Sequence, residues 1–494
     1  MVHWNRSQRP RVVRPNARKN AAVGRRRWAR PECFVTSQIP SVAAASADQM
    51  VHTFTNGLTL IAERVENVRS AALTLLIPGG AASDPENALG SASVLSDWMM
   101  RGAGGRDNRQ LTDYLDQLGV QRSITAETVF LRLSASMLAR NFGEVLPVCA
   151  DIMRQPQLPE GGFAAARDLA IQQLDAIEDE PSQKLNLILK MRHFPDPFGR
   201  PIVGQRDHLA ALTVESLRAD YHRRFSPVGA ILAVAGALEF QPLKESVANC
   251  FGEWRTCPPP PPTLKPAPGG VYHVTQPANQ VQIGLAYDTV PESHPDSILM
   301  QLAVGVLSGG MGARLFSEIR EKQGLCYAVH AGYISLARRA AIMGYAGTTP
   351  ERAATTLNSF LRELERLRQG VTAEELERAK IGMKSRVIMH GESTAARAAA
   401  LAYDYYHYGR PRTLDELRQR IERVSLEQLN AFLAGTAAAP ITQVTVGPAP
   451  VGGGEAPAIP HTAINDTFQW PGQRASGPEK QRDAASTLTN GTSQ

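Results

Sequence analysis

The sequence of 494 residues has no run of eighteen or more apolar residues, which is roughly the length that a helix needs to cross a bilayer. Its five cysteines are odd in number and form no Cys-x-x-Cys pair, and none of the eleven histidines lies in a metal-spaced pair. The sequence therefore predicts no membrane association, no disulfide framework and no thiolate zinc site. Reduced thiols favour a reducing compartment, and we expect the cytoplasm.

An excess of positive charge is also missing once the N-terminal segment is set aside. The formal net charge is +6, but residues 1–47 contain nine Arg, one Lys and a single acid, Glu32. The remaining nine-tenths of the chain is therefore mildly acidic, at about −3 by the same count. A basic groove for nucleic acid is not predicted.

The segment 1–48 itself is rich in Arg and Pro and has too little apolar surface to fold alone, so we expect a disordered basic tail. It has no apolar core of a secretory signal. It is either an Arg-rich targeting sequence or an over-extended start, because Met50 opens the first regular segment and is a candidate true start beside Met1.

A proline-rich segment divides the rest of the chain. Residues 257–270, CPPPPPTLKPAPGG, cannot form a helix or a central strand, because proline lacks the amide donor and fixes φ. The sequence therefore predicts one domain at 49–256, a linker at 257–270 and a second domain at 271–437. The Pro/Gly/Ala-rich and then polar end, 438–494, is predicted to be mostly disordered.

Within these domains, hydrophobic periodicity and turn residues predict the regular elements. An Asn56-Gly57 turn predicts an opening β-hairpin. Buried strands are predicted at 70–80 and 230–238, further strands at 326–346, and helices at 87–101, 107–118, 139–154, 159–178, 296–308, 312–322, 350–368 and 373–408. The aromatic patch 403–408 is predicted to be core or subunit contact rather than a cofactor site.

The two domains contain the same spacing. In the first, Gly105 precedes a helix that stops at Gly119, and in the second, Gly310 precedes a helix that stops at Gly324, fourteen residues in both cases. Both helices follow an apolar helix and lead into strands. The order of elements predicts a duplicated α+β fold in which helices pack on one face of a mainly antiparallel sheet.

Several phrases resemble the pitrilysin (insulinase-like) zinc peptidases, which include mitochondrial processing peptidase and its bacterial relatives. They are TNGLTLI, IPGGAASDP, FPDPFGRPIVG and, most specifically, SGGMGARLFSEIREKQGLCYAV at 308–329. The resemblance covers about residues 50–435 and implies two homologous α/β-roll units that form half of a clamshell. The long glycine-rich insertion of the processing peptidase's recognition subunit is absent.

The resemblance also locates the family's zinc motif, His-x-x-Glu-His, at Ser93, Ser96 and Asp97, and its second-helix Glu at Gln173. Serine and a neutral amide are poor zinc ligands, and Ser96 cannot accept a proton from water as Glu does. We therefore expect these four positions to be polar remnants of a cleft, and no cofactor to be bound by this chain.

The family also carries an Arg and a Tyr, seven residues apart, in the half that faces the zinc, and they match Arg320 and Tyr327. The resemblance implies that Arg320 holds the peptide and that Tyr327 stabilises the oxyanion. The alternative is that Arg320 pairs with a nearby Glu on its helix and Tyr327 packs in its strand.

Because the family builds its chamber from four such units, the resemblance implies that two come from another chain. The leading hypothesis is a non-zinc subunit of a heterodimeric metallopeptidase, with zinc in a homologous partner and an unfolded or short peptide as substrate. The rival hypothesis is an inactive structural or assembly protein, like the core subunits of respiratory complex III. An active zinc peptidase by itself is disfavoured, because every zinc-motif position has changed.

Overall fold

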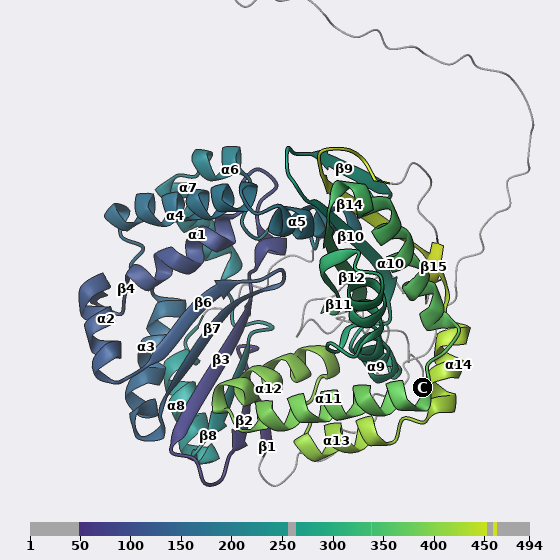
Figure 1. The fold of residues 1–494 in the computed structure, drawn as a ribbon. Helices are drawn as coiled ribbons and strands as arrows, with labels where there is room; N and C mark the ends of the chain where they lie inside the picture. Colours follow the sequence, from purple (N-terminus) through teal and green to yellow (C-terminus); the bar gives the residue numbers. More distant parts are fainter. Residues whose placement is uncertain (1–48, 255–262, 337, 452–457, 462–494) are drawn as a thin grey trace, which may run out of the picture. The chain divides into compact units, whose positions relative to one another are not determined.

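The computed structural model describes residues 49–254, 263–336, 338–451 and 458–461. The predicted basic tail and the first part of the predicted linker, 257–262, lie outside these residues. The described chain contains two large sheets, each accompanied by helices (Figure 1). No helix in the described ranges is long and apolar enough to span a membrane.

The first sheet has the strand order β1-β2-β8-β3-β7-β6, in which β2 and β8 run parallel and all other neighbours antiparallel. Its strands are β1 (Gln49–Thr53), β2 (Thr59–Arg64), β3 (Ser70–Pro78), β6 (Gln121–Ala126), β7 (Phe130–Leu138) and β8 (Ile231–Gly236). The helices are α1 (Ser91–Trp98), α2 (Asn108–Gln117), α3 (Phe142–Arg154), α4 (Glu160–Glu178), α5 (Pro181–His193), α6 (Arg206–Ala211), α7 (Val214–Arg224) and α8 (Phe240–Phe251). A short pair, β4 (Gly102–Ala103) and β5 (Arg106–Asp107), joins α1 to α2.

The second sheet has the order β11-β12-β10-β14-β9. Its strands are β9 (Val271–Thr275), β10 (Val281–Thr289), β11 (Cys326–Leu336), β12 (Arg339–Thr348) and β14 (Thr442–Gly447). The helices are α9 (Ser297–Ser308), the π-helix η4 (Leu315–Lys322), α10 (Ala353–Arg368), α11 (Ala373–Gly391), α12 (Thr394–Tyr408), α13 (Leu414–Glu422) and α14 (Leu426–Gly435). A small separate ribbon pairs β13 (Ala437–Pro440) with β15 (Ala458–His461).

The two sheets repeat one topology. Without β1, the first reads β2-β8-β3-β7-β6 and the second β9-β14-β10-β12-β11, and the single parallel pair occupies the same place in each. Mainly antiparallel sheets with helices packed on them confirm the predicted α+β class. The shared strand order and directions confirm the duplication that the glycine spacing predicted.

The halves exchange one helix each. Helix α12 from the second half packs on β3 and β8 of the first sheet, and the equivalent α5 packs on β10 and β14 of the second (Figure 1). Small residues allow this close approach. The side chains of Leu185 and Leu189 lie over Gly284, where a Cβ would be 3.1 Å from both. The aromatic patch on α12 is part of the contact between α12 and the first half, since the Tyr403 hydroxyl donates to the Glu127 carboxylate.

Two predictions of local structure are wrong. The tail predicted to be mostly disordered, 438–494, contains β14, whose six residues are all buried in the sheet interior, because alternating Thr and Val suit a strand between β10 and β9. Its residues 452–457 and 462–494 lie outside the described residues. The helix predicted at 373–408 is two helices. The chain breaks after Gly391, and the Ser393 side chain caps α12 by accepting from the amide of Ala396.

Candidate functional site

The candidate site in the first half begins at the start of α1, which a buried carboxylate holds in place. Asp84 accepts hydrogen bonds from the amides of Gly90 and Ala92 and from the Ser91 hydroxyl, at 2.8–3.0 Å. The guanidinium of Arg224, fully buried on α7, lies 3.0 Å from the same carboxylate. Burial raises the pKa of Asp84, whereas Arg224 and the hydrogen bonds act in the opposite direction. This network fixes the helix that carries the first three zinc-motif positions.

Two glycines bring the chain into contact at the same point. Gly90 has φ of +98° and Gly204 has φ of +84°, and a Cβ on Gly204 would lie 2.5 Å from the Leu89 carbonyl oxygen. Only glycine fits both the left-handed backbone and the close approach. At the other end of α1, the Trp98 indole donates to the carbonyl of Pro159, which precedes α4. Helices α1 and α4 are therefore held side by side.

Two of the four side chains at the zinc-motif positions, those of Ser96 and Asp97, make local contacts. The Ser96 hydroxyl donates to the Ser93 carbonyl at 2.7 Å, and Asp97 forms an ion pair with Arg101, also at 2.7 Å. Gln173 is exposed on α4. No group of three or more His, Cys, Asp or Glu side chains in the described part of the chain could hold a metal ion. The donors at this position do not suit zinc, because serine hydroxyls and an amide replace imidazole and carboxylate.

Arg320, in the second half, lies on the π-helix η4, where the amide of Gln323 bonds to the carbonyl five residues earlier, at Glu318. Turns of π-helix are rare and frequent at functional sites. The Arg320 side chain is exposed, and its guanidinium lies over the ring of Phe316, 4.7 Å from the centroid. Glu318 pairs with Lys322 instead, and among the described residues Arg320 has no acidic partner. The described residues thus show no ion pair between Arg320 and a Glu of its own helix.

Tyr327 lies where β11 is irregular. Cys326 faces Thr348 and Ala328 faces Gly347, so Tyr327 is the extra residue of a β-bulge. Its side chain is 61% exposed, and its hydroxyl has no hydrogen-bond partner in the described ranges, so the alternative of a packed strand residue is wrong. Burial raises the pKa of the neighbouring Cys326 thiol, and Arg320 acts to lower it. Arg320 and Tyr327 thus lie at the same end of the strand.

Comparison with known proteins agrees with this architecture. The family model described as insulinase (peptidase family M16) matches residues 59–206, and the model described as the peptidase M16 inactive domain matches residues 211–383. The two matches follow each other along the chain, and the second begins before α7 and β8, which belong to the first sheet. The chain belongs to peptidase family M16.

Relatives of this M16 chain match along most of their length. An uncharacterized zinc protease of Mycobacterium leprae is 25% identical over 79% of this chain and 89% of its own, and one of Bacillus subtilis is 24% identical over 77% and 94%. A solved peptidase M16 inactive domain from Pseudomonas fluorescens covers 82% of the chain with a TM-score of 0.74 and 20% identity. A protease from Helicobacter pylori covers 81% with a TM-score of 0.75 and 19% identity. These structures confirm the fold.

Sequence reasoning missed the residues that anchor this M16 scaffold. Asp84 had a signal, since an Asp-Pro pair shortly before a helix is typical of a turn whose side chain can cap. Arg224 had none, because its partners Asp84 and Ser91 are more than 130 residues away in the sequence. Long-range ionic contacts of this kind depend on the complete fold.

Proposed function

We propose that this chain is the non-zinc subunit of a heterodimeric M16 metallopeptidase. In this proposal a homologous partner subunit holds the zinc and the general base, and this chain binds no metal. The substrate is an unfolded or short peptide. Arg320 and Tyr327 complete the site from this chain.

The observation that carries the proposal is the exposure of Tyr327 on a β-bulge, beside an exposed Arg320 on a π-helix. The π-helix and the β-bulge each interrupt a regular element, and each carries an exposed polar side chain at that point. An unpaired phenol can donate a hydrogen bond to an oxyanion, and a guanidinium can hold a peptide carbonyl with two donors. The loss of all four zinc-motif side chains, by contrast, favours a chain that does not act alone.

The test is reconstitution with a homologous subunit that has an intact His-x-x-Glu-His helix. Tyr327→Phe removes a donor that acts mainly in the transition state, so turnover should fall by about 10²–10³ with less effect on substrate binding. Arg320→Ala should weaken both binding and turnover. Tyr272→Phe is the matched control, because Tyr272 is also exposed, at 40%, but lies on β9.

The rival function, an inactive structural or assembly protein, gives the opposite result. In that case the complex has no peptidase activity that depends on Arg320 or Tyr327. A Tyr327→Phe complex as active as wild type, with unchanged melting and unchanged association, would make these residues ordinary surface groups. It would favour the structural role.

A further inference from the structure

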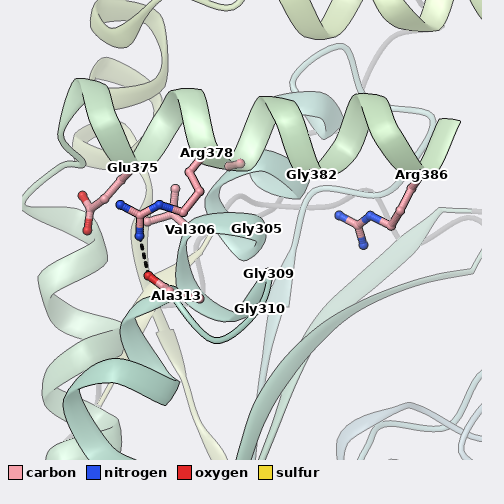
Figure 2. Close-up of a pocket in the computed structure, with 11 residues that line it drawn as sticks. Gly305, Val306, Gly309, Gly310, Ala313, Glu375, Arg378, Gly382 and Arg386 are labelled. Atoms are coloured by element: carbon pink, nitrogen blue, oxygen red, sulfur yellow. Dashed lines mark hydrogen bonds between the residues drawn. The ribbon is translucent and has the colours of Figure 1, made fainter. Parts of the chain in front are cut away.

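The second half contains a cavity of about 380 Å³ between α9, β11 and α11. A smaller cavity of about 50 Å³ adjoins it beneath α11 and shares Gly305, Gly309 and Arg386 in its lining (Figure 2). The larger cavity is within the size of sites for small ligands, which begin at roughly 300 Å³. Its apolar lining is formed by Val304, Ala331, Met383 and Val387.

The one carboxylate that lines this cavity already has partners. Glu292 accepts from the Gln301 amide at 2.7 Å and from the Tyr408 hydroxyl at 2.9 Å. The guanidinium of Arg412 lies 3.6 Å away, and only 17% of the Glu292 side chain is exposed. Glu292 therefore has little capacity left to accept a hydrogen bond from a ligand, and its charge is compensated.

The charged group that remains, Arg386, can only donate hydrogen bonds. Arg386 and His390 lie one turn apart on α11, line the cavity and have no hydrogen bond or ion pair in the described chain. In Figure 2 the Arg386 side chain extends away from α11. Ser308 uses its oxygen to accept from a β11 amide at 2.8 Å, which leaves its own hydrogen free to donate. Arg386 and the Ser308 hydrogen therefore favour a ligand that accepts hydrogen bonds, and preferably an anion.

The duplication of the fold independently points to a negatively charged ligand at this position. Helix α11 is the counterpart of α4, because each is the second helix after the paired edge strands of its half. Gln173 and Arg386 both lie thirteen residues after the first residue of their helix. The position that carries a zinc-binding carboxylate in the family thus has a free cation in this half.

We propose that this cavity binds a carboxylate carried by an apolar residue, as at the C-terminus of a short peptide. Arg386 pairs with the carboxylate, and the aliphatic lining receives the side chain. The substrate interpretation rests on the proposed function. Ala331 lies four residues from Tyr327 along β11, roughly 13 Å at the rise of a strand, so a short extended peptide could reach between the two.

The experiment measures binding by calorimetry to the isolated full-length chain, so it does not depend on a partner or on hydrolysis. The probes are a tetrapeptide that ends in leucine as the free acid, its C-terminal amide, and N-acetyl-leucine as a small free acid. We expect the free-acid peptide to bind at least tenfold more tightly than the amide. Arg386→Gln should remove that difference.

Lys384→Gln is the matched control, because it removes one positive charge from the same helix but pairs with Glu422 and lines neither cavity. It should leave the preference unchanged. Equal binding of acid and amide by wild type, or a preference that survives Arg386→Gln, would overturn the proposal. Equal affinity for N-acetyl-leucine and the peptide would keep the carboxylate site but assign it to small acids. A Tyr327→Phe heterodimer as active as wild type would contradict the proposed function but would leave this binding result unchanged. The two proposals can therefore be tested independently.

Discussion

The two halves of this M16 chain build the same helix pair on the same sheet and give it different side chains. In the first half, α1 and α4 carry serines, an ion-paired aspartate and an exposed glutamine at the zinc-motif positions. In the second half, α9 and α11 enclose a cavity with a free arginine. The backbone arrangement is therefore independent of the chemistry that it carries.

The halves also differ in how the first helix of the pair is anchored. Asp84 and the fully buried Arg224 hold the start of α1. In the second half, Asp296 precedes α9 but its side chain makes no capping bond. The half that carries the zinc-motif positions therefore has the more extensively bonded first helix.

The largest effect that tests this comparison is the restoration of metal binding. Ser93→His, Asp97→His and Gln173→Glu together place three strong ligands on α1 and α4. If the scaffold is intact, zinc content after dialysis should rise from none in the wild type to about one ion per chain. Metal analysis measures this directly.

The same variant without Gln173→Glu is the control, since two histidines alone should lose zinc on dialysis. A folded triple variant that retains no zinc would mean that α1 and α4 no longer hold the ligand geometry. Stoichiometric zinc in the wild type would contradict the interpretation that the side chains on α1 and α4 do not suit zinc.

A smaller but still large effect concerns the anchor. Arg224→Leu leaves two buried carboxylates, Asp84 and Asp220, without their cation and should lower the free energy of unfolding by about 3–5 kcal/mol. Arg109→Leu removes an arginine whose side chain is 91% exposed and should change it by less than about 0.5 kcal/mol. Urea denaturation of both variants measures the difference. If both variants lose a similarly small free energy of unfolding, Arg224 does not anchor α1, and the two halves do not differ in this respect.

The sequence allowed the repeat to be predicted, because glycine turns and hydrophobic periods are local. It could not predict the exchange of α5 and α12, whose contacts join residues such as Glu63 and Arg397 that are 334 positions apart. It also gave the wrong structure for 442–447, since a short strand amid Pro and Gly depends on the neighbours that bury it. Arg320 and Tyr327 could be located from their phrase, but the π-helix and the bulge that expose them could not.

The smallest predicted effect concerns Glu375, the acid at the start of α11. Its carboxylate binds Arg314 through two bonds at 2.7 and 2.8 Å, and these hydrogen bonds, against the effect of burial, lower the pKa of Glu375 to about 2. The ionised carboxylate therefore stabilises the fold above the unfolded pKa of roughly 4.3, and this stability is lost as pH falls toward 2. Glu375→Gln should lower the free energy of unfolding by on the order of 1–2 kcal/mol at pH 7, a modest value because the pair is partly solvent-screened. The loss should be smaller at pH 2.5, because the wild-type carboxylate is then partly protonated. Urea denaturation at both pH values measures the change. An equal loss at the two would show that Glu375 acts by packing rather than by charge, and that the second half anchors α11 without an ionic contact.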